Sequence, residues 1–326
     1  MSPFNASIFQ STARRAILAL GLLATCGMAT ADPGYTFTRF QDPRGAGTNF
    51  FPTGINNNLV VTGTASFQTG FWMFGAQTAS PGILIFDVPS AFNNATFGDD
   101  INNAGVIVGS YRNGTGGHGF VLDNGVFRTI DVPGAANTTL VTGINDAGTL
   151  VGQYREAGSG KLLGFTLTGS TFTWLDAALT QPDTLAAGIN NGGRVVGTVG
   201  GGGTLARGFT FDNGVYEFFD APGATSTQAF GINTAGQIVG TASTGLFVKD
   251  GASFTTLSLP ASWNARSAFA TDITDDGVVV GYFTDNNTNL TYGFLATPTA
   301  VPEPASVVLM LAGVAALAAR RRTLRA

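Results

Sequence analysis

Histidine and cysteine, which often supply nucleophiles, general bases and zinc ligands, are almost absent from this sequence. His118 is the only histidine, and Cys26 is the only cysteine. A Ser-His-Asp triad would depend on His118, but this residue lies between Gly-Gly and Gly-Phe at the expected start of a strand, which favours a structural role. A zinc site needs further histidine or cysteine ligands, which the chain does not contain. The sequence therefore predicts no catalytic residues, no metal site and no cofactor.

Carboxylates are the remaining candidates for chemistry, and two of them interrupt a repeated pattern. Asp100 and Asp272 stand directly before an isoleucine, where equivalent segments carry glycine, and Asp99, Asp275 and Asp276 are close in sequence. Two or more carboxylates at one site can bind Ca²⁺ or act as an acid–base pair on a glycan. A structural role is the alternative, because Asp-Asp-Gly also suits a hairpin turn. Calcium is possible, but no complete calcium-binding loop supports it.

The pattern that these aspartates interrupt is a unit that recurs six times. Each unit begins at an isoleucine, these isoleucines are 41 to 46 residues apart, and a glycine follows each of them after eight residues. The six isoleucines are Ile55, Ile101, Ile144, Ile189, Ile232 and Ile273. A period of this length is typical of architectures built from stacked supersecondary units.

Each unit carries signals for four short strands. In the third unit, the turn at residues 145–148 joins the first two strands, and the Gly164-Phe165 pair opens the third. Four strands in about 44 residues are typical of a β-propeller blade, whose faces are buried by stacking in a ring. Residues 35–43 resemble a fourth strand without its first three, and the last unit lacks a fourth strand, so the two should combine. The sequence predicts an all-β, six-bladed β-propeller over residues 32–300, with Asp100 and Asp272 on strands that line its channel.

The N-terminal segment has the order of a secretory signal peptide. Arg14 and Arg15 precede an apolar run at residues 16–25, and small residues follow at Ala29 and Ala31. A basic region, a short apolar region and a small-residue cleavage site define such a signal. We therefore expect residues 1–31 to be removed by signal peptidase, which leaves the exported protein without cysteine.

The C-terminal segment, residues 301–326, combines a short motif, an apolar stretch and a basic cluster. A charge-free stretch at residues 305–319 is expected to form a transmembrane helix, with the arginines on the cytoplasmic side. The motif and the cluster are Pro302, Glu303, Pro304, Arg320, Arg321 and Arg322. This arrangement resembles the PEP-CTERM sorting signal. The resemblance implies transient anchoring in the inner membrane, cleavage by an exosortase, and a Gram-negative bacterium that makes extracellular polysaccharide.

The repeat unit itself resembles the HAF repeats of bacterial extracellular proteins. Residues 231–240, Gly-Ile-Asn-Thr-Ala-Gly-Gln-Ile-Val-Gly, carry the core of that repeat, whereas its His-Ala-Phe triplet has a relative only in His118-Gly119-Phe120. The resemblance implies an extracellular repeat protein without established catalytic residues.

Charge and location together limit the function. Residues 32–300 contain 19 acidic and 10 basic side chains, which argues against a nucleic-acid partner. The favoured hypothesis is a non-enzymatic binding or matrix protein in an exopolysaccharide layer at the cell surface, where biofilms form. One alternative is a propeller glycoside hydrolase or polysaccharide lyase that uses the channel carboxylates. The other is a structural protein without a glycan ligand.

Overall fold

Alternating burial along the strands explains why these sequences form sheets. In β3 (Phe50–Ile55), β15 (Thr184–Ile189) and β19 (Thr227–Ile232), the first, third and fifth side chains are buried and those between them are less so. Successive side chains of a strand point to opposite faces of its sheet, so one face of each strand packs against a neighbouring sheet. Asn-rich turns then reverse the chain after each first strand.

The structure is a computed structural model, and it describes residues 30–32, 34–42, 47–65, 69–74, 82–92, 95–177, 183–200 and 205–299. Ala29 and residues 301–326, and with them the predicted helix and the six sorting residues, lie outside these ranges. Ala31 falls in the short edge strand β1 (Thr30–Asp32), which pairs with β2 (Tyr35–Phe40). Cleavage after Ala31 would therefore leave only the last residue of β1.

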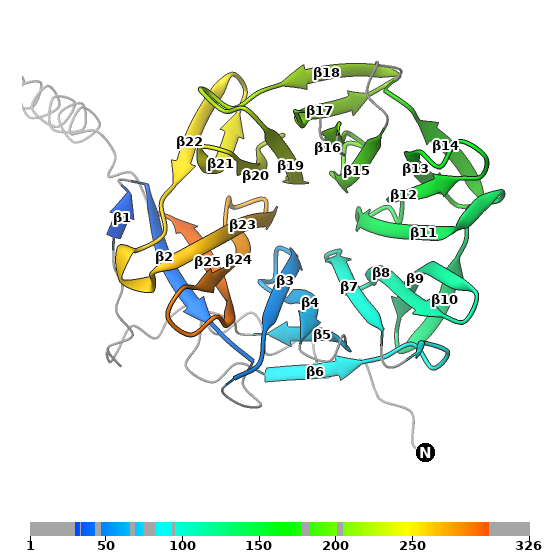
Figure 1. Cartoon of the computed structure of the whole chain (residues 1–326), viewed down its shortest axis with the longest axis horizontal. Helices are drawn as coiled ribbons and strands as arrows, with labels where there is room; N and C mark the ends of the chain where they lie inside the picture. The colour runs from blue at the N-terminus through cyan, green and yellow to red at the C-terminus, as the bar shows by residue number, and fades with distance from the viewer. Residues whose placement is uncertain are drawn as a thin grey trace, which may run out of the picture.

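Six units of four antiparallel strands surround a central channel (Figure 1). Units 1 to 3 are β3 with β4 (Val61–Ala65), β5 (Thr69–Phe74) and β6 (Gly82–Phe86); β7 (Thr96–Ile101), β8 (Ile107–Asn113), β9 (Gly116–Asp123) and β10 (Val126–Ile130); and β11 (Ala135–Ile144), β12 (Leu150–Glu156), β13 (Leu162–Thr168) and β14 (Thr171–Leu175). Units 4 to 6 are β15 with β16 (Val195–Val199), β17 (Arg207–Asp212) and β18 (Val215–Phe219); β19 with β20 (Ile238–Ala242), β21 (Gly245–Asp250) and β22 (Ser253–Leu257); and β23 (Ala265–Ile273), β24 (Val279–Asp285), β25 (Thr291–Pro298) and β2. The first strand of each unit lies nearest the channel, so the prediction of an all-β propeller is confirmed.

The predicted six-bladed arrangement is corrected at the level of the hydrogen-bonded sheets, which number five. Units 2 and 3 share one eight-stranded sheet, because Thr138 of β11 pairs in parallel with Gly117 of β9. The long strand β11 begins directly after the turn at Gly134. Gly116 and Gly117 of β9 have no side chains, so β11 can approach the backbone of β9 closely enough to pair with it. Unit 6 gains a fifth strand from β1. Only units 1, 4 and 5 form separate four-stranded sheets.

The N-terminal strand closes the ring, as the sequence predicts. β2 pairs with β25 over six residues, from Tyr35 opposite Pro298 to Phe40 opposite Gly293. The last unit thereby takes its fourth strand from the start of the domain. Since this pairing joins residues about 260 positions apart, it ties the two ends of the domain together.

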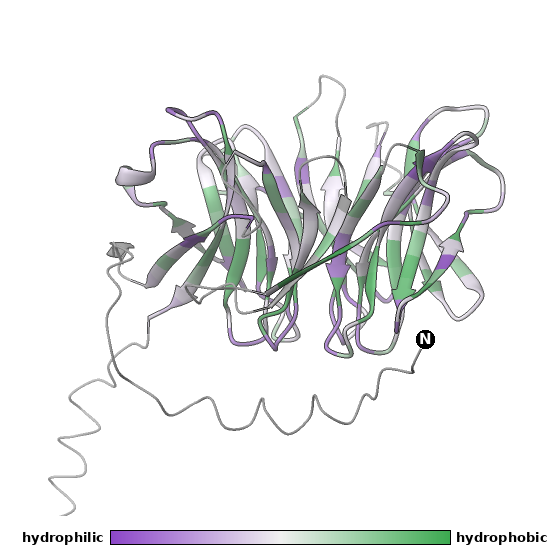
Figure 2. Cartoon of the chain, turned by 90° about the horizontal axis from the view of Figure 1, so that it is seen from below, coloured by the Kyte–Doolittle hydropathy of each residue, from purple (hydrophilic) through white to green (hydrophobic). Residues whose placement is uncertain are grey.

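The hydrophobic core is divided among the seams between adjacent units. Six clusters of buried side chains lie in the described part of the chain, one at each seam of the ring. Figure 2 shows these apolar bands running along the strands, with polar residues gathered in the loops at both ends. Each unit therefore depends on both neighbours for burial, as expected of stacked repeats.

The glycine eight residues after each isoleucine lies under an aromatic ring. At Gly197, an added Cβ would lie 2.2 Å from the carbonyl oxygen of Leu185 and 2.7 Å from the ring of the fully buried Phe209. The other five units repeat this geometry at Gly63, Gly109, Gly152, Gly240 and Gly281. A side chain at any of these positions would displace both the innermost strand and the phenylalanine of the Gly-Phe position.

Replacing Gly197 by alanine is expected to lower the free energy of unfolding by about 1–3 kcal/mol, because the core there is already full. Urea denaturation followed by tryptophan fluorescence measures the change. Gly114→Ala is the matched control, since a Cβ at Gly114 meets no atom within 4 Å. Equal stability of the Gly197 and Gly114 variants would contradict the packing explanation.

Candidate functional site

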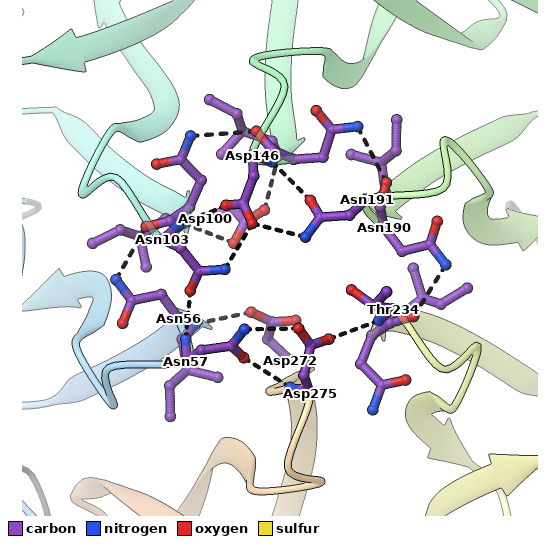
Figure 3. Close-up of a pocket in the computed structure, with 18 of the residues that line it drawn as sticks. Asn56, Asn57, Asp100, Asn103, Asp146, Asn190, Asn191, Thr234, Asp272 and Asp275 are labelled. Carbon is purple, nitrogen blue, oxygen red and sulfur yellow. Dashed lines mark hydrogen bonds between the residues drawn. The ribbon is translucent and has the colours of Figure 1, made fainter.

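A ring of asparagines closes one end of the channel (Figure 3). Each one follows the core isoleucine of its unit and donates a hydrogen bond from its Nδ2 to the backbone carbonyl oxygen of the equivalent residue in the next unit. The links are Asn56 to Asn102 (3.0 Å), Asn102 to Asn145 (3.3 Å), Asn145 to Asn190 (3.1 Å), Asn190 to Asn233 (3.0 Å) and Asn233 to Thr274 (3.0 Å). The repeated Ile-Asn sequence therefore serves the ring as well as its own hairpin.

The same asparagines hold their own turns. Asn190 Oδ1 accepts hydrogen bonds from the backbone N–H groups of Gly192 and Arg194, both at 3.0 Å. The buried side chain of Asn190 thus accepts two hydrogen bonds within its own hairpin and also links that hairpin to the next unit. Buried polar groups in proteins are normally paired in this way, because an unpaired one costs free energy.

Unit 6 departs from this pattern, and a carboxylate makes the last connection. Thr274 replaces asparagine, and its Oγ1 accepts a hydrogen bond from Val278 N–H within its own turn. Asp275 instead bonds both adjacent units: its Oδ2 accepts from Asn57 Nδ2 at 2.7 Å and its Oδ1 from Thr234 N–H at 2.8 Å. Partial burial alone would raise the pKa of Asp275, but these hydrogen bonds outweigh it and hold the pKa below its ordinary value.

Asp100 and Asp272, the carboxylates predicted at the channel, each cap two strands. Asp100 accepts hydrogen bonds from Ile101 N–H at 2.7 Å and from Ile144 N–H of the next unit at 2.8 Å. Asp272 does the same with Ile273 and with Ile55 of unit 1, both at 2.8 Å. Each carboxylate therefore fastens one seam of the ring.

Burial raises the pKa of these acids. Burial, with smaller effects from neighbouring charges, raises the pKa of Asp100 to about 6 and that of Asp272 well above its ordinary value. Burial also raises the pKa of Asp99 to about 8, and the neighbouring charge of Asp100 adds to the shift. The backbone hydrogen bonds to Asp100 and Asp272 favour the charged form, but they do not overcome the loss of water.

The cavity inside the asparagine ring is small. It holds about 60 Å³, enough for a few water molecules, whereas ligand sites usually span roughly 300–1,000 Å³. Asp100 and Asp272 both line this cavity. The cavity is too small to hold a sugar ring beside these two carboxylates, so the geometry does not support an acid–base pair acting on a glycan.

Asp146, which the sequence analysis did not single out, belongs to the same end of the channel. Its Oδ1 accepts from Asn103 N–H at 2.9 Å and its Oδ2 from Asn191 Nδ2 at 2.7 Å, so it joins units 2 and 4 to unit 3. The available signal was its position, because Asp146 follows Asn145 as Asp275 follows Thr274. Both acids therefore contribute to a second set of hydrogen bonds between neighbouring units.

His118 occupies a repeat position that carries a basic side chain in one other unit, unit 4. Its Nδ1 donates to Asp131 Oδ1 at 2.7 Å, and its Nε2 accepts from Thr115 Oγ1 at 2.9 Å. At the equivalent position in unit 4, Arg207 pairs with Asp220 at 2.9 Å. Thr115 Oγ1 also lies 2.6 Å from Asn113 Oδ1, which competes for its single proton. The histidine is therefore a repeat-position residue that orders its hairpin.

The three tryptophans differ in their surroundings. Trp263 is buried and stacks on Phe283 at 5.0 Å, so it presents no exposed surface to a sugar ring. Trp174, on the outer strand β14, is 49% exposed and stacks on Phe172 at 5.5 Å. The side chain of Trp72 lies outside the described residues. Of the two tryptophans whose side chains are described, Trp174 is the exposed one.

The described residues contain no group of three or more His, Cys, Asp and Glu side chains that could hold a metal ion. In this part of the chain, no helix has both the length and the apolar character needed to cross a bilayer. The predicted C-terminal helix lies outside the described residues.

Comparison with known proteins identifies one motif. Residues 300–322 match the family model described as PEP-CTERM protein-sorting motif. This match confirms the predicted resemblance at the C-terminus and implies export, membrane-associated sorting and processing by an exosortase. The HAF-type character of the repeats stays a prediction. No curated protein matches the chain in sequence.

Solved structures show distant likeness to the repeat region. AofleA from Arthrobotrys oligospora is 14% identical with a TM-score of 0.45, and the match covers 78% of this chain and 87% of that one. YCF48 bound to D1 peptide is 12% identical with a TM-score of 0.43, over 85% and 98% of the two chains. The β-propeller domain of the Trilobed protease from Pyrococcus furiosus, with its open velcro topology, is 10% identical with a TM-score of 0.40, over 78% and 99%. Likenesses below a TM-score of 0.5 carry no argument about function.

The strand pairing and the motif together define the class. The chain is an all-β propeller that carries a PEP-CTERM sorting motif, and it is exported and sorted by an exosortase.

Proposed function

We propose that this protein is a non-enzymatic binding component of an exopolysaccharide layer, retained at the surface of a Gram-negative cell or in its biofilm matrix. The observation that carries the proposal is the sorting motif at residues 300–322 beside a propeller. In the described residues, the repeat units of the propeller form five hydrogen-bonded sheets. Export places their loops and outer strands outside the cytoplasm, where polysaccharide is the abundant polymer. Nucleic acid is not a partner in this proposal.

Binding without catalysis is favoured by the state of the channel acids. Asp100 and Asp272 each accept two backbone hydrogen bonds inside a cavity of about 60 Å³. A hydrolase or lyase would need at least one carboxylate to reach a sugar ring. We further propose that the protein requires no cofactor, and testing with and without Ca²⁺ addresses the calcium alternative.

The outer face of unit 3 supports a binding role. Trp174 lies parallel to Phe172, with 9° between the ring planes, and Tyr154 lies 5.3 Å from Trp174. Phe218 occupies the equivalent position in unit 4, beneath the guanidinium of Arg207 at 5.8 Å. Exposed aromatic rings held by their neighbours present flat apolar surface at little entropic cost, which suits stacking on a sugar ring.

Co-sedimentation with the producer's own extracellular polysaccharide tests the proposal. The exported protein is expected to sediment saturably with the polymer, without release of new reducing ends. Trp174→Ala should weaken binding by about 5- to 10-fold, the equivalent of losing roughly 1 kcal/mol of contact. Val126→Ala is the matched control, because Val126 is a 68% exposed apolar residue on the outer strand of unit 2.

Two outcomes would contradict the proposal. Absence of sedimentation both with and without Ca²⁺ would remove the binding and the hydrolytic functions together and favour a structural protein. New reducing ends that disappear in the Asp100→Asn or Asp272→Asn variant would favour the hydrolase or lyase instead.

A further inference from the structure

A hollow lies at the seam between units 5 and 6, at the end of the propeller opposite the asparagine ring. We call it the seam hollow. It encloses about 520 Å³ between β20–β22 and the segment that contains the short helix η4 (Ala261–Trp263). This volume is within the usual range of small-molecule sites, roughly 300–1,000 Å³. Trp263, the last residue of this helix, stacks on Phe283 of β24 and so holds the helix in place.

A missing hydroxyl helps to open the hollow. At four other seams, a threonine near the start of the first strand accepts a hydrogen bond from a backbone N–H of the preceding unit. These pairs are Thr96 with Val88, Thr139 with Val132, Thr184 with Ala177 and Thr227 with Ala221. The equivalent residues here are Ala268 and Leu259, and both line the hollow. Because alanine has no acceptor, Leu259 N–H is available to a ligand.

A missing charge pair enlarges the same space. The third strand of unit 4 begins with Arg207, which bonds Asp220, and unit 2 has His118 with Asp131 at the same two positions. The equivalent positions in unit 5 are Gly245 and Ser258. Gly245 also follows a tight β20–β21 turn, in which Ala242 pairs directly with Gly245. The side chains that fill this region in units 2 and 4 are therefore absent.

The lining of the hollow combines aliphatic walls with neutral polar groups. Its walls include Leu246, Leu257 and Pro260, and no ionisable side chain lies among the described residues that line it. Thr241 Oγ1 is buried at the wall without a hydrogen-bond partner. Asn264 adds a side-chain amide at the rim. A buried hydroxyl left unpaired costs free energy, which a ligand with an accepting or donating oxygen would recover.

We propose that the seam hollow binds a neutral sugar residue that carries an acetyl group, which deepens the polysaccharide-binding function proposed above and rests on it. The carbonyl oxygen of the acetyl group would accept from Leu259 N–H and Thr241 Oγ1–H. Its methyl group would lie against the leucines and Pro260, and the sugar hydroxyls would face Asn264. A uronic acid is disfavoured, because no lining cation compensates the burial of its charge.

Titration of the exported protein with simple glycosides, followed by NMR, tests the site. The methyl glycoside of N-acetylglucosamine is expected to bind at least 10-fold more tightly than methyl glucoside or methyl glucuronide. Thr241→Val removes the hydroxyl at nearly constant shape and should weaken binding by about 5-fold, the equivalent of one hydrogen bond. Ala261→Phe places a ring at the exposed lip of the hollow and should abolish binding. Ser262→Phe is the matched control, since Ser262 is exposed on the same helix and does not line the hollow.

Either of two results would overturn the proposal: no binding of the acetylated glycoside at millimolar concentration, or binding that Ala261→Phe leaves unchanged. Co-sedimentation separates this failure from failure of the proposed function. If the Ala261→Phe variant still sediments with the polysaccharide, the matrix role stands and another surface, such as that around Trp174, carries it. If the unmodified protein does not sediment, the proposed function fails as well.

Discussion

Replacing Asn190 by alanine is expected to lower the free energy of unfolding by about 2–4 kcal/mol. The substitution removes the link to Asn233 at 3.0 Å and two hydrogen bonds within the hairpin, to Gly192 and Arg194. It leaves the carbonyl oxygen of the buried Asn233 without its donor and two part-buried N–H groups without their acceptor, and an unpaired buried polar group costs more than its hydrogen bond contributed. Urea denaturation measures the change.

Unit 6 carries threonine where the other units carry asparagine, and this difference suggests variants to compare with Asn190→Ala. Threonine at position 274 accepts one hydrogen bond within its own turn and makes no asparagine-type link, so Asn190→Thr should keep the bond to Arg194 but lose the link and the bond to Gly192, at a cost of about 1–2 kcal/mol. In the opposite direction, Thr274→Asn should add a link to unit 1 and stabilise the protein by about 0.5–1 kcal/mol. If Asn190→Ala and Asn190→Thr were equally destabilising, the inter-unit link would have no measurable value.

The protein is expected to become more stable as the pH falls from 8 to 5, opposite to the usual behaviour of proteins rich in paired carboxylates. The pKa of Asp99 is raised to about 8 and that of Asp100 to about 6, so the folded state holds more protons than the unfolded state across this range. Where the folded state binds the extra proton, stability falls as the pH rises, by up to about 1.4 kcal/mol per pH unit for each group. Asp272 acts in the same direction. The lowered pKa of Asp275 acts in the opposite sense, but only below its ordinary value of 3.8.

Thermal unfolding at several pH values, compared between the protein and its Asp99→Asn variant, tests this expectation. The variant should be more stable than the parent at pH 8, nearly equal to it at pH 4, and less dependent on pH between these values. Asp123→Asn removes an exposed hairpin carboxylate and should leave the profile unchanged. A parent protein that gains stability from pH 5 to pH 8 would show that the channel acids are charged and well solvated.

Residues that recur in every unit were the ones whose structural role could be predicted from the sequence. The glycine after each isoleucine must avoid a backbone carbonyl and an aromatic ring, and this requirement is identical in every unit, so it appears as a fixed spacing of eight residues. Ring closure by β2 was predictable because an incomplete unit at each end left two fragments that fit together. The same spacing gave no sign of the parallel pair between Thr138 and Gly117, since that contact depends on how closely two units approach.

The sequence showed which residues depart from the repeat, but it did not show what these residues do in the folded protein. Asp100 and Asp272 stood out because they replace glycine, yet only the structure shows each of them bonded to two backbone N–H groups in a cavity without room for a sugar. The seam hollow depends on Gly245, Ser258 and Ala268, three small residues that mark no motif. Their effect arises only where they meet across a seam.

The sequence by itself determined the sorting motif, the all-β character and the number of repeats, because each is written in contiguous residues or in a fixed spacing. Tertiary structure decided how the repeats merge into sheets, which acids lose their water and where a ligand has room. These properties depend on distances between residues of different units, and a linear pattern does not contain those distances until the ring has closed.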